Sequence, residues 1–314
     1  MGVVRTMIVT RNIANVAALA ALSVIGFAGA AAAADEPKSP FTYSFNVGIT
    51  TDYVFRGYSQ KKDHPALQGG FDLGYAVTPN ITTYFGVWGS GVDFGTNATG
   101  DGTRVAGAEV DIYGGIKPVW GPATFDFGVI WYTYPGSNDH GGAARQVAQQ
   151  NYVELKAGVS GAFIPGLDKL TTGATLFYSP SYQGGQGEVV TVEGTAAYEL
   201  PKVWVFTPTV SGTIGGQFGS DAAKAFDINN GVFNFGSDKG FLLGNGENSL
   251  AYWNAGVSLG LEKLTFDFRY WGTSVKNDST TGANGWCDGS GNNGAGLGAL
   301  TCDSRFVFTA KYTY

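Results

Sequence analysis

The feature that most constrains the fold is an alternation of apolar and polar residues that recurs along most of the chain. In the segment 41–50, aromatic and aliphatic side chains alternate with Thr, Ser, Asn and Gly. The same period of two recurs in the segments 71–77, 125–131, 153–160 and 264–270. A period of two is typical of β-strands that have one apolar face. The runs have the length of about 10 residues that a tilted strand needs to cross a bilayer.

The polar face of these strands indicates a wet interior. Charged side chains always fall opposite the aromatic set, as Asp267 and Arg269 do among Phe266, Phe268 and Tyr270. A soluble sandwich would carry many charges outside, but only 14% of the residues are charged, against about 25% in soluble domains. The 49 glycines, 21 Phe, 16 Tyr and 7 Trp take their place. After residue 34 the chain has no continuous run of 18 apolar residues, the length that a membrane-spanning helix needs. The pattern therefore predicts an all-β fold, a closed antiparallel transmembrane β-barrel.

The connectors between the expected strands alternate between short and long. The short ones are 78–80, 117–122, 163–169, 199–202 and 262–263. The long ones are 57–65, 95–106, 135–150, 181–187, 217–249 and 272–303. Outer-membrane barrels have short periplasmic turns and longer external loops, so we expect about 12 strands, with 10–14 as the range, and both termini on the periplasmic side. The facing of 81–94 and 203–216 is ambiguous, and 217–249 could contain a hairpin.

The first 34 residues are typical of a secretory signal peptide. Arg5 and Arg11 precede an apolar stretch and an alanine tract, and an A-x-A cleavage site ends at Ala34. An N-terminal membrane anchor is the alternative, but the apolar run is short for a spanning helix. We therefore expect a signal peptide over 1–34 and the barrel over 35–314. The mature chain then has 17 basic and 25 acidic side chains, a net charge of 17 − 25 = −8, which argues against a nucleic-acid partner.

The last segment, 305–314, ends in an aromatic residue on an alternating strand. Phe306, Phe308, Tyr312 and Tyr314 share one face. An aromatic C-terminus of this kind resembles the signal that the barrel-assembly machinery recognises in outer-membrane barrels. We therefore expect that machinery and outer-membrane lipid among the partners, and the cell outer membrane as the location.

A motif near the mature N-terminus resembles a known family. It runs from Asp52 through Gln60 as D-Y-V-F-R-G-Y-S-Q, and from Pro65 through Asp72 as P-A-L-Q-G-G-F-D. These residues are similar to the TorF family of porins, and the similarity covers about 41–94. The resemblance implies an outer-membrane pore and no particular substrate.

The same motif contains a candidate charged cluster. Asp52 and Arg56 are four residues apart on an expected strand and so share a face, and Asp72 lies on the same side of the next strand. Rings of charged side chains filter solutes in pores. Arg56 could equally pair with a carboxylate to make a buried charge tolerable, and both interpretations can hold together.

Strand parity predicts a wider set of charged residues that line the lumen. The acids are Asp52, Asp72, Glu109, Asp111, Asp126, Glu154, Glu193 and Asp267, and the bases are Arg56, Lys156, Arg269, Arg305 and Lys311. Eight acids against five bases predict a weak preference for cations, or passage of small neutral solutes.

The remaining chemistry-bearing residues are few. Cys287 and Cys302 are the only cysteines, both in the last external loop of an exported chain, and they predict a disulfide. His64 and His140 lie beside aspartates in expected external loops, without a recognisable nucleophile, and are expected to be solvated. No metal site, phosphate loop or cofactor is expected. Five tryptophans are expected on strands, several of them in the interfacial aromatic girdles: Trp88, Trp131, Trp204, Trp253 and Trp271.

These features predict a passive diffusion channel for ions or small solutes, and not an enzyme. A barrel of about 12 strands leaves a narrow, partly filled interior, and the long external loops could fold inward to gate it. Two alternatives stay open. One is a closed barrel whose external loops bind a partner, and the other is an outer-membrane barrel hydrolase.

Overall fold

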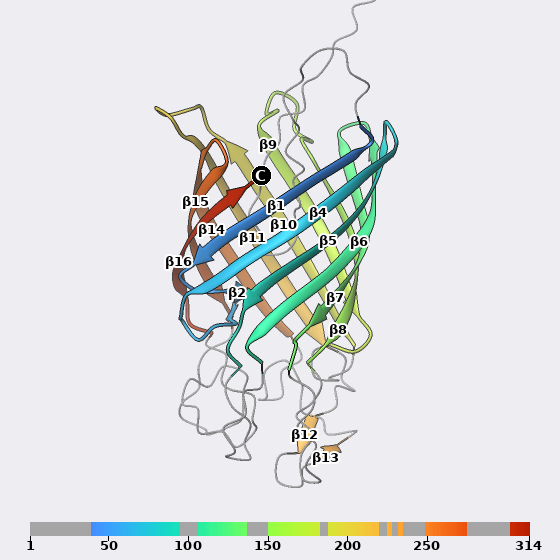
Figure 1. Ribbon diagram of the computed structural model, residues 1–314, viewed down its shortest axis with the longest axis vertical. Coiled ribbons are helices and arrows are strands. Elements are labelled where there is room, and N and C mark those ends of the chain that lie inside the picture. Colours follow the sequence, from blue (N-terminus) through green and yellow to red (C-terminus); the bar gives the residue numbers. More distant parts are fainter. Residues whose placement is uncertain are drawn as a thin grey trace, which may run out of the picture.

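Twelve strands close into one antiparallel barrel (Figure 1). The computed structural model describes residues 39–94, 106–136, 150–182, 188–219, 225–227, 232–234, 249–274 and 302–314. The barrel strands are β1 (Phe41–Thr50), β4 (Ala66–Thr78), β5 (Ile81–Gly91), β6 (Ala108–Trp120), β7 (Ala123–Thr133), β8 (Tyr152–Gly161), β9 (Leu170–Ser179), β10 (Val189–Glu199), β11 (Thr207–Gly219), β14 (Ser249–Leu261), β15 (Leu264–Thr273) and β16 (Arg305–Thr313). Each of these strands pairs with its neighbours in chain order, which confirms the predicted fold class.

The barrel is closed by pairing between its first and last strands. β16 pairs with β1 in the register Asn46↔Thr313 to Thr50↔Thr309. Tyr314 extends this pairing with two backbone hydrogen bonds to Phe45, and the two rings stack 5.0 Å apart. Closure leaves none of the twelve barrel strands with an unpaired edge, and lipid requires this because nothing there replaces a lost backbone hydrogen bond.

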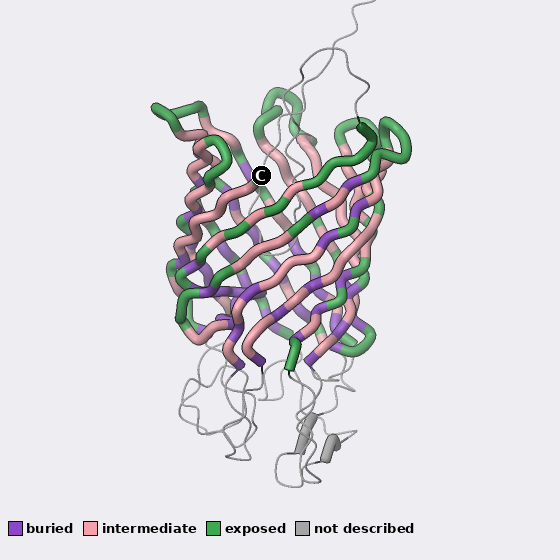
Figure 2. The backbone as a smooth tube through the Cα atoms, in the orientation of Figure 1, coloured by how far each residue is buried: buried purple, intermediate pink, exposed green. Residues whose placement is uncertain are grey.

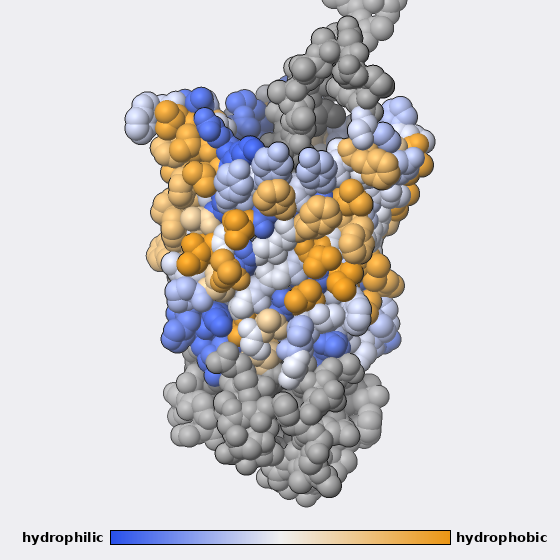
Figure 3. All heavy atoms as spheres, viewed as in Figure 1, coloured by the Kyte–Doolittle hydropathy of each residue, from blue (hydrophilic) through white to orange (hydrophobic). Residues whose placement is uncertain are grey.

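The outer surface of the barrel carries an apolar band (Figure 3). Phe45, Phe71, Phe127, Leu155 and Phe268 are among the large apolar side chains that are exposed on it. Their strand neighbours with the opposite parity face the interior and are mostly buried or half-buried. A surface of this kind fits hydrocarbon and not water, so the chain is an outer-membrane barrel. None of the described residues forms a helix long and apolar enough to span a membrane.

The facing of the two ambiguous strands is resolved by the same exposure pattern. On β5, Phe85 is exposed and Tyr84 is buried; on β11, Val210 and Ile214 are exposed. β11 begins only at Thr207, since the preceding residues form a turn.

Only some of the five tryptophans lie on the outer surface, where the predicted aromatic girdles would be. Trp131 and Trp253 are exposed on the outer surface. Trp204 lies in a turn and not on a strand, so that assignment was wrong. Trp88 and Trp271 point inward, because they share strand parity with the buried residues Ser90 and Arg269.

The two ends of the barrel differ as the connector lengths predict. Short turns over 79–80, 121–122, 162–169, 200–206 and 262–263 lie at one end, the short-turn end. The strand ends that lead into the longer connections lie at the opposite end, the long-loop end, where Figure 1 labels β2. By analogy with barrels of this class the long-loop end is external. The connection after β11 contains the short antiparallel pair β12 (Ala225–Asp227) and β13 (Val232–Asn234), a hairpin of the kind considered for this segment. The expected signal peptide, His140 and Cys287 lie outside the described residues.

Candidate pore constriction

The first long connection folds into the barrel instead of projecting from it. Between β1 and β4, the strands β2 (Val54–Phe55) and β3 (Tyr58–Ser59) pair as a small hairpin. All residues from 52 to 60 are buried. We call 53–60 the inward hairpin. Asp52 and Arg56 therefore do not lie on a barrel strand, as the sequence interpretation assumed; Asp52 precedes the hairpin and Arg56 lies in its turn.

The turn of the inward hairpin is tight and strained. Phe55 pairs with Tyr58, so only Arg56 and Gly57 connect the two strands. Both have positive φ, 49° for Arg56 and 89° for Gly57, as a two-residue turn of the I′ type requires. Glycine adopts this region freely, whereas arginine does not. A strained residue persists when its surroundings hold it in place, and the contacts of Arg56 do so.

Arg56 reaches the far wall of the barrel. Its guanidinium makes two hydrogen bonds to the Glu154 carboxylate on β8, at 2.6 and 2.8 Å. β8 is separated from β1 by β4 to β7 in the strand order, so it lies close to the opposite side. Phe177 stacks 4.8 Å from the guanidinium carbon. Burial lowers the pKa of Arg56, but the carboxylate of Glu154 outweighs it and the pKa rises above its ordinary value. Arg56 is therefore a charged side chain that ties the hairpin across the lumen.

Further contacts anchor the hairpin to other parts of the wall. The hydroxyl of Tyr53 donates to Glu109 on β6 at 2.7 Å. Gly57 packs against Tyr252 and Thr273, and a Cβ added to it would lie 2.9 Å from a side-chain atom of each. The hairpin therefore contacts β6, β8, β14 and β15, which together surround the lumen.

Asp52 holds the base of the hairpin. Its carboxylate accepts hydrogen bonds from Ser59 at 2.7 Å and from Arg305 on β16 at 2.9 Å. Burial raises the pKa of Asp52, while the Ser59 hydroxyl and the Arg305 charge oppose that rise. Arg305 also contacts Asp63.

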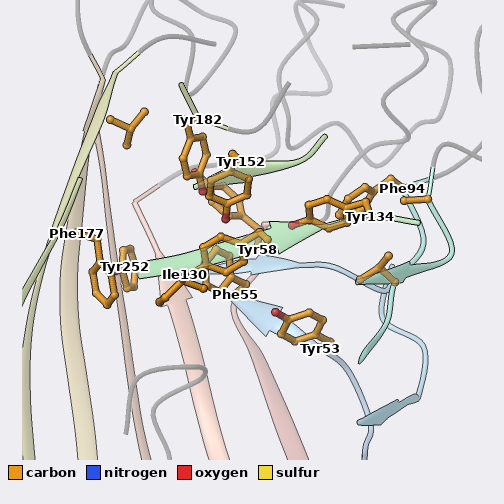
Figure 4. Close-up of a cluster of buried hydrophobic side chains, with 14 of the residues drawn as sticks. Tyr53, Phe55, Tyr58, Phe94, Ile130, Tyr134, Tyr152, Phe177, Tyr182 and Tyr252 are labelled. Atoms are coloured by element: carbon orange, nitrogen blue, oxygen red, sulfur yellow. The ribbon is translucent and has the colours of Figure 1, made fainter. Parts of the chain in front are cut away.

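Aromatic rings fill the space around the inward hairpin (Figure 4). Tyr53, Phe55 and Tyr58 from the hairpin belong to one buried cluster with rings from the wall and the outer connections. The wall and connection rings are Phe94, Tyr132, Tyr134, Tyr152, Phe177, Tyr182 and Tyr252. Tyr132 and Tyr152 stack with centroids 4.4 Å apart. The buried side chains in the lumen thus gather towards the long-loop end, where the buried residues concentrate in Figure 2.

Towards the short-turn end the inner wall is polar and only partly buried. Asp126 on β7 accepts hydrogen bonds from Tyr84 at 2.7 Å and from Lys156 at 2.8 Å. Lys117 lies 3.9 Å from the same carboxylate. Lys117 was missed because the sequence interpretation placed it in a turn, although it continues the inward parity of Asp111 along β6.

Asp72 and Arg269 also face the lumen, and both are buried, at 5% and 4% exposure. Tyr113 donates to Asp72 at 2.6 Å. Arg269 is held by Asp267, Asn254 and Ser211. These side chains stay on the wall and do not cross the lumen.

Asp111 differs from the other inward carboxylates. It is 0% exposed, and neither of its oxygens has a hydrogen-bond partner among the described residues. Glu109 precedes it by two residues on the same face of β6, and its cross-strand neighbours are Trp88 and Tyr132.

All the predicted lumen residues on strands point inward. Glu193 and Lys311 also point into the lumen. Glu193 on β10 accepts a hydrogen bond from Tyr252 at 2.6 Å, and Lys311 on β16 is half-buried. Their role in permeation stays a prediction.

The predicted disulfide stays a prediction, whereas the predicted exposure of His64 is seen in the structure. Cys302 is 2% exposed and carries no free thiol, but its predicted partner Cys287 lies outside the described residues. His64 is exposed, and its Nδ1 lies 2.6 Å from the carbonyl oxygen of Lys62. Among the described residues no group of three His, Cys, Asp or Glu side chains is arranged to hold a metal ion.

The closed, apolar-banded barrel with an internal hairpin defines the class of this protein as an outer-membrane β-barrel. A family profile matches residues 34–245, and the chain belongs to that family, Gcw_chp, described as a bacterial protein of unknown function. The match does not confirm the resemblance to the TorF family, which stays a prediction. No curated protein matches the chain in a sequence search.

Several solved structures are similar to this barrel at low identity. An outer membrane channel from Pseudomonas putida F1 has 10% identity and a TM-score of 0.45, over 88% of this chain and 96% of that one. LpxR from Salmonella typhimurium has 9% identity and a TM-score of 0.43, over 86% and 99%. The NanC porin has 9% identity and a TM-score of 0.42, over 86% and 99%. All three TM-scores lie below 0.5, so the assignment to a closed barrel comes from the strand pairing.

Proposed function

We propose that the protein is an outer-membrane channel for small solutes, narrowed by its inward hairpin. The observation that carries the proposal is the polar inner wall. Charged groups such as Lys117, Asp126 and Lys156 line it and keep partial exposure. A barrel that served only as an anchor would gain more from an apolar, filled interior, because each buried charge costs desolvation. The polar wall is therefore a path for water and small solutes.

In this proposal the inward hairpin forms the gate of the channel. It crosses the lumen by the Arg56–Glu154 ion pair and fills the long-loop end with aromatic rings. Solute passes when the hairpin withdraws from the wall. The acidic groups around the hairpin favour cations over anions, which is the finer selectivity that we propose for this channel.

We further propose the export route that the sequence predicts. A signal peptide over 1–34 directs the chain out of the cytoplasm, and the β16 strand with its terminal Tyr314 presents the barrel to the assembly machinery. The Cys287–Cys302 disulfide and the absence of enzymatic activity belong to the same proposal.

A closed barrel with partner-binding loops is the second candidate function, because the hairpin and its rings fill one end of the lumen. The two functions differ in conductance. We would record single-channel currents from the refolded mature chain in a planar bilayer, beside a variant in which 54–59 are replaced by two glycines. Rare or small steps from the native chain and larger, steady steps from the variant would support the gated channel. Silence from both folded proteins would overturn the channel and leave the closed barrel.

A further inference from the structure

Asp111 lies at the inner boundary of the constriction. Along β6 the side chains of Glu109, Asp111 and Tyr113 point inward in succession. Glu109 contacts the inward hairpin through Tyr53, whereas Tyr113 is half-buried and bonds to Asp72. Asp111, which is 0% exposed, therefore lies on β6 between the residue that contacts the hairpin and the half-buried Tyr113.

The charges around Asp111 are not balanced by the residues that contact them. Arg56 neutralises Glu154, which also accepts a hydrogen bond from Tyr132 at 3.0 Å. Glu109 accepts from the neutral hydroxyl of Tyr53. Both oxygens of Asp111 lack a hydrogen-bond partner among the described residues. Arg56 is thus the single base beside three neighbouring carboxylates. The carboxylate without a hydrogen-bond donor is Asp111, which lies between the hairpin and the polar lumen.

Aromatic rings flank this carboxylate. Trp88 and Tyr132 are its cross-strand neighbours on β5 and β7, so all three side chains share the inner face. The ring of Tyr53 lies 5.4 Å from that of Trp88. The negative faces of aromatic rings attract large, weakly hydrated cations. A lone carboxylate, by contrast, does not supply the several oxygen ligands that Mg²⁺ or Ca²⁺ requires.

We propose that Asp111, with the rings of Trp88, Tyr132 and Tyr53, is a binding site for a small alkylammonium ion. The carboxylate supplies the counter-charge and the N–H acceptor, and the rings cover the alkyl part. The site deepens the proposed channel by naming its solute class, and it rests on that function only for the route by which the ion arrives.

The test is an equilibrium binding measurement that needs no conductance. The refolded barrel in detergent micelles is titrated with ethylammonium chloride by calorimetry, with sodium chloride keeping the ionic strength constant. We expect saturable binding by the native chain and at least tenfold weaker binding by Asp111→Asn. Asp126→Asn is the matched control, since it removes an inward carboxylate that already has Tyr84 and Lys156 as partners, and its binding should match the native chain.

Three results would overturn the site: no saturable binding by the native chain, equal loss in both variants, or equal affinity for potassium. If Asp111→Asn does not fold, Trp88→Leu tests the same site, because removal of the ring should weaken ethylammonium binding while the charge stays. Retained affinity in Trp88→Leu would then count against it. A barrel that binds ethylammonium through Asp111 but passes no current in bilayers would refute the proposed channel function and support the binding site. A conducting barrel without binding would do the reverse.

Discussion

Substitution of Glu154 by glutamine should open the proposed channel. Glu154 and Arg56 are 1% and 3% exposed, and two hydrogen bonds join them. The glutamine keeps the shape and one acceptor, but it removes the charge of the only carboxylate that contacts the buried guanidinium among the described residues. Breaking a buried pair in this way costs about 3–5 kcal/mol. The strained turn at Arg56 adds to the loss, because its positive φ is tolerated only while the guanidinium is held.

The lower end of this range, about 3 kcal/mol, is the better estimate of the cost, since the amide oxygen of the glutamine still accepts one hydrogen bond. At about 1.4 kcal/mol for each factor of ten, 3 kcal/mol shifts the equilibrium between inserted and withdrawn hairpin by about 100-fold. A channel that is open for a small fraction of the time would become mostly open. Single-channel recording in a planar bilayer measures this directly as open probability.

The matched control is Glu199→Gln at the short-turn end. Glu199, the last residue of β10, also pairs with a base, Lys169, at 3.2 Å, but the side chains of this pair are 23% and 52% exposed. Exposed pairs contribute about 0–1 kcal/mol, and this one does not touch the hairpin. Equal open probability in Glu154→Gln and Glu199→Gln would refute the reasoning that the Arg56 ion pair holds the gate.

Three further outcomes follow from the barrel wall. Gly215→Val should destabilise the barrel by about 1–3 kcal/mol in urea unfolding followed by gel mobility, because a Cβ there would overlap the inward ring of Tyr252. Gly194→Ala should be nearly neutral in the same assay, because its Cβ would meet its nearest neighbour at 3.7 Å. Spin labels at Phe127 and Asp126 should report oxygen accessibility from lipid and nickel-complex accessibility from water, respectively, and the opposite pattern would contradict the strand facing. Deletion of Tyr314 removes two closing backbone hydrogen bonds, so the yield of folded barrel in outer membranes should fall.

The barrel itself was predictable because its determinants are local. Lipid on one side and a polar lumen on the other impose a period of two on each strand, as in β7 and β15. Turn length then sets which end faces the periplasm. Neither inference needs contacts between distant residues. The inward parity of Glu109, Glu154 and Arg269 was therefore readable from the sequence alone.

The inward hairpin was not predictable in the same way. Its position depends on Glu154, which is 98 residues from Arg56 in the chain. The sequence interpretation counted Asp52 and Arg56 as one strand face and expected a loop from residue 57. A signal was present: Tyr53, Val54 and Phe55 are three consecutive apolar residues, which breaks the alternation that a lipid-facing strand requires. Such a run needs burial on both sides, and inside a barrel only the lumen provides it.

The lumen charges, counted as one set, predict only a weak cation preference. The structure divides them into a group near the inward hairpin and a group in the rest of the lumen. Near the hairpin are Asp52, Glu109, Asp111, Glu154 and Glu193, with Arg56 and Arg305. In the rest of the lumen are Asp72, Asp126 and Asp267, with Lys117, Lys156, Arg269 and Lys311. The acid excess therefore lies at the constriction, and a base excess lies beyond it. Since the narrowest part governs selectivity, the channel should prefer potassium to chloride more than the total count suggests.

The reversal potential under a potassium chloride gradient tests whether the charges near the hairpin or those in the rest of the lumen determine ion selectivity. The native channel should show a cation-selective potential, and Glu109→Gln with Asp111→Asn should move it towards zero. Neutralising Lys117 and Lys311 by glutamine should move it less, because these side chains are more exposed than Glu109 and Asp111, so their charges are screened more strongly. A larger shift from the lysine pair would mean that the short-turn end governs permeation, and the hairpin would then not be the selectivity element.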